Sequence, residues 1–214
     1  EFARRLLCGN GMASGCDTCN SCRSASKLEH PDFHLLFPIR KKSSENQGTW
    51  AEEFDNHRKL LAEEPYAPVI YEKGVQITVD MVSDAQEKLM ESSFEGGRRV
   101  CVILNAERLN PATANRMLKI LEEPPESVHF IMTAEQISKV LPTIVSRSSV
   151  LRFGRLHEHE IAGYLTERTG IDKAKAVMLA GMAEGSIKTA KALCDEEKRR
   201  FIEASFELYS EIAY

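Results

Sequence analysis

A cluster of cysteines near the start of the 214-residue chain constrains its local fold more than any other feature. Four of the six cysteines stand within residues 8–22: Cys8, Cys16, Cys19 and Cys22. Two overlapping C-x2-C steps bring three thiolates into one tight turn, and the first cysteine completes a set of four. Zinc accepts four thiolates in a tetrahedron, and a set with no open position is typical of a structural site. We therefore predict a structural Zn2+ ion here.

Two disulfides are one alternative to zinc, and a redox or iron–sulfur site is another. The residues show no signal peptide, no glycosylation sequon and no transmembrane run, which favours a reducing compartment. Cys101 lies inside the apolar run Val100–Leu104, as a buried free thiol would. His30 and His34 are candidate substitute ligands, but four cysteines make them unnecessary. We expect a zinc protein of the cytoplasm without membrane contact.

The charge balance limits the partners of the chain. A net charge of −4, with 28% charged residues, argues against sequence-blind coating of nucleic acid, which needs a strongly basic face. Contact with DNA through partner proteins remains compatible with this charge. The first residues, Glu1–Leu7, resemble the end of a helix with no beginning, so we expect the sequence to be part of a longer chain.

Apolar periodicity predicts alternating strands and helices from residue 76 onward. Gln76–Val79 is expected to be extended, and Asp80 is expected to cap a helix. The apolar face of that helix is predicted to carry Val82, Ala85, Leu89 and Met90. Val100–Leu104 and Val128–Thr133 are continuously apolar, which is typical of strands buried on both faces of a parallel sheet.

Further signals complete the predicted order of elements. Asn110 followed by Pro111 predicts a capped helix start, and Val150–Phe153 is predicted to be a last strand. Alternation of strand and helix indicates an α/β fold with a mainly parallel sheet flanked by helices over residues 1–155. The cysteine module is inserted in it at about 8–30.

Helical patterns replace strands after this point. Helices are expected near 157–169, 172–183 and 186–194, separated by glycines. They predict a small helical domain over residues 156–194. Residues 195–214 are predicted to start a further helical domain.

Several segments, in this order, resemble one family. They are the cysteine module, His30-Pro-Asp32, the run ANRMLKILEEPP at Ala114–Pro125 and TIVSRS at Thr143–Ser148. Together they resemble subunits of the bacterial DNA polymerase III clamp loader, which are ATPases of the AAA+ class. The resemblance covers nearly the whole chain except 38–75, which is longer than usual. It implies an AAA+-like domain with an inserted zinc module, a helical lid and the start of a collar domain. The family's N-terminal strand and phosphate loop are absent from the sequence.

The end of the strand 100–104 separates two subunit types of this family. The gamma or tau motor ends this strand in Asp-Glu, which serve magnesium and the attacking water, whereas this chain has Leu104 and Asn105. The resemblance therefore implies the delta-prime type. Such a subunit has no ATPase activity of its own, although it belongs to a DNA-directed DNA polymerase holoenzyme. A catalytically active gamma/tau-type ATPase with a displaced acid such as Glu107 remains one alternative, and a zinc-ribbon nucleic-acid-binding module another.

The resemblance also assigns roles to residues outside the cysteine module. In the family a Ser-Arg-Cys motif projects an arginine onto ATP at the neighbouring subunit. It implies that Arg147, supported by Ser146, acts as an arginine finger in trans, with Ser148 in place of the cysteine. The alternative is an ordinary arginine paired with a surface acid. Lys188 lies where related motors place a nucleotide-sensing arginine and is a further candidate.

The implied partners follow from the same family. They are gamma/tau subunits, a delta subunit, the sliding clamp and, through the complex, primed DNA during replication. The implied location is the nucleoid-associated replisome of the bacterial cytoplasm.

Overall fold

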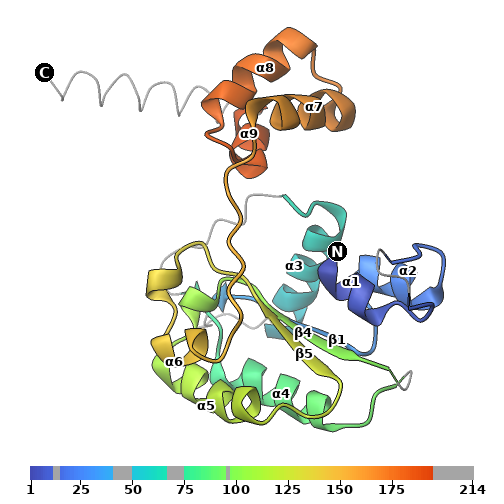
Figure 1. Ribbon diagram of the computed structural model, residues 1–214, viewed down its shortest axis with the longest axis vertical. Coiled ribbons are helices and arrows are strands. Elements are labelled where there is room, and N and C mark those ends of the chain that lie inside the picture. Colours follow the sequence, from blue (N-terminus) through green and yellow to red (C-terminus); the bar gives the residue numbers. More distant parts are fainter. Residues whose placement is uncertain (12–14, 41–49, 67–74, 95–96, 195–214) are drawn as a thin grey trace, which may run out of the picture. The chain divides into compact units, whose positions relative to one another are not determined.

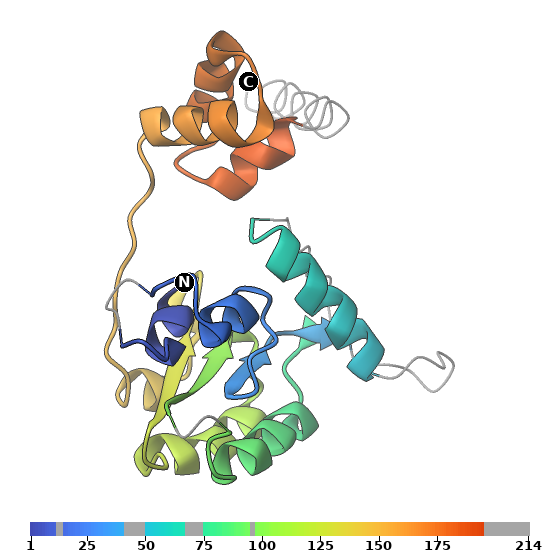
Figure 2. The same cartoon turned by 90° about the vertical axis from the view of Figure 1, so that its right-hand side faces the viewer.

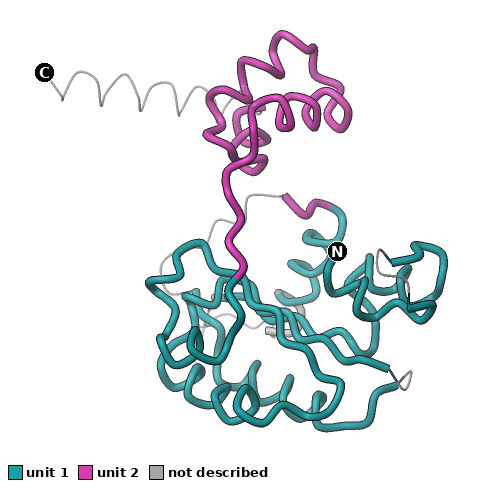
Figure 3. Tube along the Cα trace, viewed as in Figure 1, with its two compact units in different colours: residues 1–63, 71–150 teal, residues 64–70, 151–214 magenta. Residues whose placement is uncertain are grey.

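The chain folds into two compact units in the computed structural model (Figure 3). The structure describes residues 1–11, 15–40, 50–66, 75–94 and 97–194. Unit 1 comprises Glu1–Glu63 and Tyr71–Val150, and unit 2 comprises Glu64–Ile70 and Leu151–Tyr214.

A three-stranded parallel sheet forms the centre of unit 1 (Figure 1). Its order is β1-β4-β5, and the strands are β1 (Phe33–Leu36), β4 (Arg99–Ile103) and β5 (Val128–Met132). Phe33 lies opposite Val100, and Arg99 lies opposite Val128. Both predicted strands are present, and the predicted α/β class with a parallel sheet is confirmed. The predicted burial on both faces holds for β4, whereas β5, at the edge of the order, is mostly half-buried. A small antiparallel pair, β2 (Ile39–Arg40) and β3 (Val75–Gln76), lies apart from this sheet.

Helices cover both faces of the sheet (Figure 2). Alternate residues of β4 explain this, because Cys101 and Ile103 belong to the core formed with α4 and α5, whereas Val100 packs with Leu7 and Ala25 on the opposite face. The helices of unit 1 are α1 (Phe2–Leu7), α2 (Asn20–Ser26), α3 (Trp50–Glu63), α4 (Val79–Met90), α5 (Pro111–Glu122) and α6 (Pro142–Val145), with short 3-10 turns η1 (Ala106–Arg108) and η2 (Ile137–Lys139).

Side-chain caps mark the starts of α4 and α5. Asn110 accepts a hydrogen bond from the Thr113 amide at 2.8 Å, with Pro111 at the first helical position, as predicted for α5. The expected cap of α4 was wrong: Thr78 has the extended backbone and its hydroxyl accepts from the Met81 amide, so Asp80 falls within the first turn.

Two further expectations fail for reasons of exposure and pairing. Met90 does not join the apolar face of α4, since it is the last residue of the helix and its side chain is 71% exposed. The predicted strand Val150–Phe153 is wrong, because no strand of the described residues pairs with it and an isolated run has no ladder partner. Phe153 is 92% exposed.

The described residues of unit 2 form three helices where helical spacing predicts them: α7 (Glu158–Thr169), α8 (Lys173–Met182) and α9 (Ile187–Cys194). Their core includes Ile161, Leu165 and Leu179, all fully buried. Gly170 ends α7 in the left-handed region, at φ 67°, and Asp172 caps α8. The helical start predicted at 195–214 lies outside the described residues. No helix in the described ranges is long and apolar enough to span a membrane.

Candidate metal centre and exposed arginine

The four cysteines of the module converge on one point. Cys8 ends α1, Cys19 caps the start of α2, and Cys22 lies one turn further along α2. Gly15, at φ 73°, permits the turn that brings Cys16 towards them. The ligand atoms of all four residues lie within 4.8 Å of one another.

These distances fit a tetrahedral thiolate site. With Zn–S bonds of about 2.3 Å, tetrahedral geometry separates the sulfurs by about 3.8 Å, and the Sγ atoms of Cys16 and Cys22 are 3.9 Å apart. A disulfide requires about 2.05 Å between sulfurs, and all six cysteines of the chain are free. The arrangement therefore suits a metal ion and contains no disulfide.

Hydrogen bonds to sulfur prepare the cluster for negative charge. The Cys19 amide donates to Cys16 Sγ at 3.3 Å, and the Cys22 amide donates to Cys19 Sγ at 3.3 Å. Hydrogen bonds, first from Thr18 and then from Cys19, lower the pKa of Cys16 to about 5, whereas burial raises the pKa of Cys22 to about 11. A bound cation would offset the cost of a buried thiolate at Cys22.

The segment that follows the module is fastened to the sheet. Asp32 is buried, and its carboxylate accepts from Ser93 Oγ at 3.0 Å and from the Phe94 amide at 2.9 Å. The Asp32 amide donates to Nδ1 of buried His30 at 3.0 Å. His30-Pro-Asp32 therefore joins the cysteine module to the loop after α4.

Sequence reasoning missed two arginines that support this region. Arg58 of α3 donates to the carbonyl of Leu28, just after α2, at 3.3 Å and pairs with Asp55. Arg99 is 8% exposed and donates to the carbonyls of Leu89, Glu91 and Glu126. An arginine at the start of an otherwise apolar run is the sequence signal that could have revealed Arg99.

Neither of the two residues that follow β4 is an acid. Leu104 is half-buried, and its amide donates to the Leu36 carbonyl at 2.8 Å. Asn105 adopts the left-handed region at φ 55°, and its amide donates to Thr133 Oγ1 at 3.2 Å. Oε1 of the displaced acid Glu107 accepts from Asn105 Nδ2 at 3.4 Å, whereas Oε2 is buried without a hydrogen-bond partner.

Arg147 lies in the turn after α6. Its amide donates to the carbonyl of Ile144, which is 1% exposed and anchors α6 in the core. The guanidinium pairs with Glu122, the last residue of α5, at 2.6 Å, and the arginine side chain is 36% exposed. Ser146 Oγ donates to the Thr143 carbonyl at 3.1 Å and accepts from Arg147 Nη1 at 3.5 Å.

Lys188 lies in the first turn of α9 in unit 2 and is exposed. Gly185, at φ 81°, precedes that helix, and Ser186 Oγ accepts from the Thr189 amide at 3.2 Å. This places a cation at the start of a helix, where helix dipoles disfavour it.

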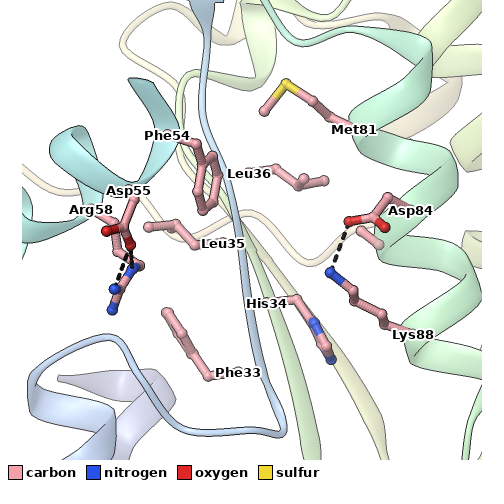
Figure 4. A pocket seen from close by; sticks show the side chains of 11 residues that line it. Phe33, His34, Leu35, Leu36, Phe54, Asp55, Arg58, Met81, Asp84 and Lys88 are labelled. Carbon is pink, nitrogen blue, oxygen red and sulfur yellow. Dashed lines mark hydrogen bonds and ion pairs between the residues drawn. The ribbon is translucent and has the colours of Figure 1, made fainter. Parts of the chain in front are cut away.

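A hollow of about 270 Å3 beside β1 was not anticipated (Figure 4). Phe33 and Leu35 point towards α3, and His34 points towards α4. Burial, followed by the charge of Lys88, lowers the pKa of His34. The lining residues include no member of the cysteine cluster and neither Arg147 nor Lys188.

Comparison with known proteins identifies a family. Residues 1–157 match the model of the family described as "DNA polymerase III, delta subunit". DNA polymerase III subunit delta′ of Haemophilus influenzae is 24% identical over 212 residues, which are 97% of this chain and 55% of that protein. The delta′ subunit of Pseudomonas aeruginosa is 32% identical over 148 residues, 69% of this chain and 35% of that protein.

A second subunit type is also similar. DNA polymerase III subunit tau/gamma of Haemophilus influenzae is 27% identical over 201 residues, which are 91% of this chain and 24% of that protein. The chain thus spans about half, or less, of the length of these relatives.

Proposed function

Because this chain belongs to the DNA polymerase III delta-subunit family and is similar to its delta′ members, we propose that it is a non-hydrolysing delta′-type subunit of the clamp loader. In this role it donates an arginine to a neighbouring ATPase subunit while the sliding clamp is loaded on primed DNA. It has the AAA+-like fold of such subunits.

The observation that carries the proposal is the pair at the end of β4. A nucleotide-hydrolysing site needs a carboxylate to hold magnesium and another to activate water. Leu104 offers neither, and Asn105 is an amide whose backbone is bound to Thr133. Oε1 of Glu107, the displaced acid, accepts a hydrogen bond from Asn105 Nδ2 within the loop that follows β4. The chain is therefore proposed to lack ATPase activity of its own.

Arg147 is proposed to supply the remaining chemistry. A guanidinium is always charged and planar, so it can bind phosphate oxygens bidentately and stabilise the charge that develops in phosphoryl transfer. Its position after a helix anchored by Ile144, with partial exposure, supports reach towards a neighbour. Ser146 supports the local turn through Thr143. ATP is then bound at the neighbouring subunit, and Lys188 of unit 2 is a candidate nucleotide sensor.

Zn2+ is the proposed metal, held by Cys8, Cys16, Cys19 and Cys22. The mutual distances and the amide donors to sulfur support four thiolate ligands with no position open to substrate. The ion would supply cross-linking of α1 to α2 and no step of a reaction.

The wider assignments rest on the family. We propose an AAA+-like domain over 1–155 with the zinc module at 8–30, a lid over 156–194 and a collar beginning in 195–214. The similarity to tau/gamma supports related gamma/tau subunits as neighbours. The delta subunit, the clamp, primed DNA and a place in the nucleoid-associated replisome of the cytoplasm complete the proposal.

That same similarity favours one rival, an active tau/gamma-type ATPase. The test is ATP turnover by the purified full-length chain, alone and after mixing with gamma/tau subunits. We expect no turnover alone and, in the mixture, turnover that exceeds that of the gamma/tau subunits by themselves. Magnesium-dependent hydrolysis by the solitary chain would overturn the proposal. Strong, salt-sensitive DNA binding by the solitary chain would instead favour a zinc-ribbon nucleic-acid module.

A further inference from the structure

The guanidinium of Arg147 is held on its own chain through both terminal nitrogens. Nη2 donates to Oε1 of Glu122 at 2.6 Å, and Nη1 donates to the Thr143 carbonyl at 3.0 Å. Bidentate binding of a phosphate requires two N–H groups that point together at the anion. Arg147 must therefore release Glu122 before it can grip a phosphate in that way.

The ion pair between Glu122 and Arg147 is favourable but weak enough to be broken reversibly. Glu122 is the last residue of α5, so the partial negative charge of the helix end adds to its own charge. The side chains of Arg147 and Glu122 are 36% and 49% exposed, so water screens the pair. Exposed ion pairs of this kind favour the paired over the unpaired state by a factor of only about 1.5 to 5.

A nucleotide phosphate is a stronger competitor than this pair. It presents several negative charges and, in an enclosed site between subunits, less screening than the open surface gives. A ligand that binds only the released arginine shifts the population towards release. A nucleotide at the neighbouring subunit would thus favour the released arginine, and the pair with Glu122 would form again once the nucleotide had left.

We propose that Glu122 is a latch for Arg147. It is a positioning residue that keeps the guanidinium on α5 until the neighbour's nucleotide draws it away, and so lowers the rate at the neighbouring site. This inference rests on the proposed function, and it adds the regulation of that site. It also gives a physical role to an acid of the Leu-Glu-Glu-Pro-Pro run, which the proposed function leaves unused.

The chain offers a matched control at the adjacent position. Glu123 carries the same charge, is exposed and caps the end of the same helix. The ion pair of Arg147 is formed with Glu122. Changing either acid to glutamine alters the charge of the helix end equally, but only one change weakens the latch.

The experiment measures kcat and KM for ATP of the clamp loader assembled with the full-length chain. Glu122→Gln and Glu123→Gln are each introduced with Arg147 present and in an Arg147→Ala background. We expect Glu122→Gln to raise kcat/KM by about 1.5- to 5-fold and Glu123→Gln to leave it unchanged. In the Arg147→Ala background Glu122→Gln should have no effect on kcat/KM, because Glu122 is proposed to act only through Arg147.

The outcomes separate the latch from the function on which it rests. If Arg147→Ala alone leaves turnover intact, the arginine-finger function fails, and the latch fails with it. If Arg147→Ala lowers turnover but Glu122→Gln lowers or preserves it, only the latch is overturned. A gain that persists without the arginine, or that Glu123→Gln reproduces, also overturns the latch.

Discussion

Arg147 donates to Glu122 at 2.6 Å and thereby joins the turn after α6 to the last residue of α5. The two residues come from two of the segments that carry the family resemblance. The surface acid considered as the alternative partner of Arg147 is thus present, and the finger role of Arg147 stays a prediction. An arginine paired in the solitary chain is still available to a partner, because the pair is exposed.

Replacing Arg147 by alanine should slow ATP turnover of the assembled clamp loader without preventing assembly. Arginine fingers contribute roughly 10³- to 10⁵-fold in rate, so the site next to this subunit should become nearly inactive. The total rate should fall by that site's share. Arg147→Lys should recover little, because an ammonium lacks the planar fork. Turnover is measured on complexes isolated by size; an unchanged rate would falsify the finger role.

Removing the metal should unfold the cysteine module and leave the rest of the chain folded. A cross-link between α1 and α2 is lost, while the core of unit 1 and the helices of unit 2 have their own contacts. Chelation or Cys19→Ser should open residues 8–30 to protease and leave most of the helical circular dichroism.

Metal content provides the direct check of this prediction. Wild type should bind one zinc per chain, and Cys194→Ser, a cysteine outside the cluster, should bind the same amount. Loss of all helical signal on chelation would contradict a separable module, and absence of bound zinc in wild type would contradict the site.

Arg99→Met should destabilise unit 1 by about 2 to 4 kcal/mol, because it leaves the carbonyls of Leu89, Glu91 and Glu126 without their charged donor. Arg98→Met is the matched control, since Arg98 is adjacent and exposed. Urea unfolding of both variants measures the difference. Equal midpoints would show that the carbonyls find other donors.

His34 should make stability fall as the pH drops. Burial, then the charge of Lys88, lowers its pKa below the ordinary 6.5, while Asp32 acts in the opposite sense. Just below pH 6.5, His34 therefore binds a proton in the unfolded chain but not yet in the folded chain. The contribution of neutral His34 to the stability of the folded state is complete above pH 6.5 and is lost as the pH falls towards the folded pKa.

Replacing His34 by glutamine should flatten this dependence between pH 7 and 5. The slope lost should stay below about 1.4 kcal/mol per pH unit, the limit for one proton. His159→Gln on α7, at an exposed position, should keep the wild-type slope. Parallel curves for wild type and His34→Gln would rule out this titration as a contributor.

The apolar runs of β4 and β5, one helix cap and the helical spacing of unit 2 were the parts of the fold that the sequence predicted well. The strands β4 and β5, the Asn110 cap and the three helices of unit 2 depend on local pattern, which is legible in one segment at a time. Val150–Phe153 misled the same reasoning, because an apolar run becomes a strand only beside a partner whose position the run itself does not encode.

The sites divide in a similar way. Close spacing makes the four cysteines predictable, since three of them share one turn and the fourth is a short loop away. The pairing of Arg147 with Glu122 joins residues 25 positions apart, and the hollow beside β1 assembles three elements. Neither the ion pair nor the hollow has a local sequence pattern, so neither could be predicted without the tertiary structure.

Leu7 precedes Cys8 by one residue and is buried against the sheet in the same cluster as Val100. The ligand Cys8 of a bound ion would thus be the residue next to Leu7, which packs with Val100 of β4. If the cysteines lost such an ion, the packing of α1 on that face of the sheet would be the first part of unit 1 to loosen. Occupancy of the cysteine cluster would in this way reach the central strand β4 through Leu7.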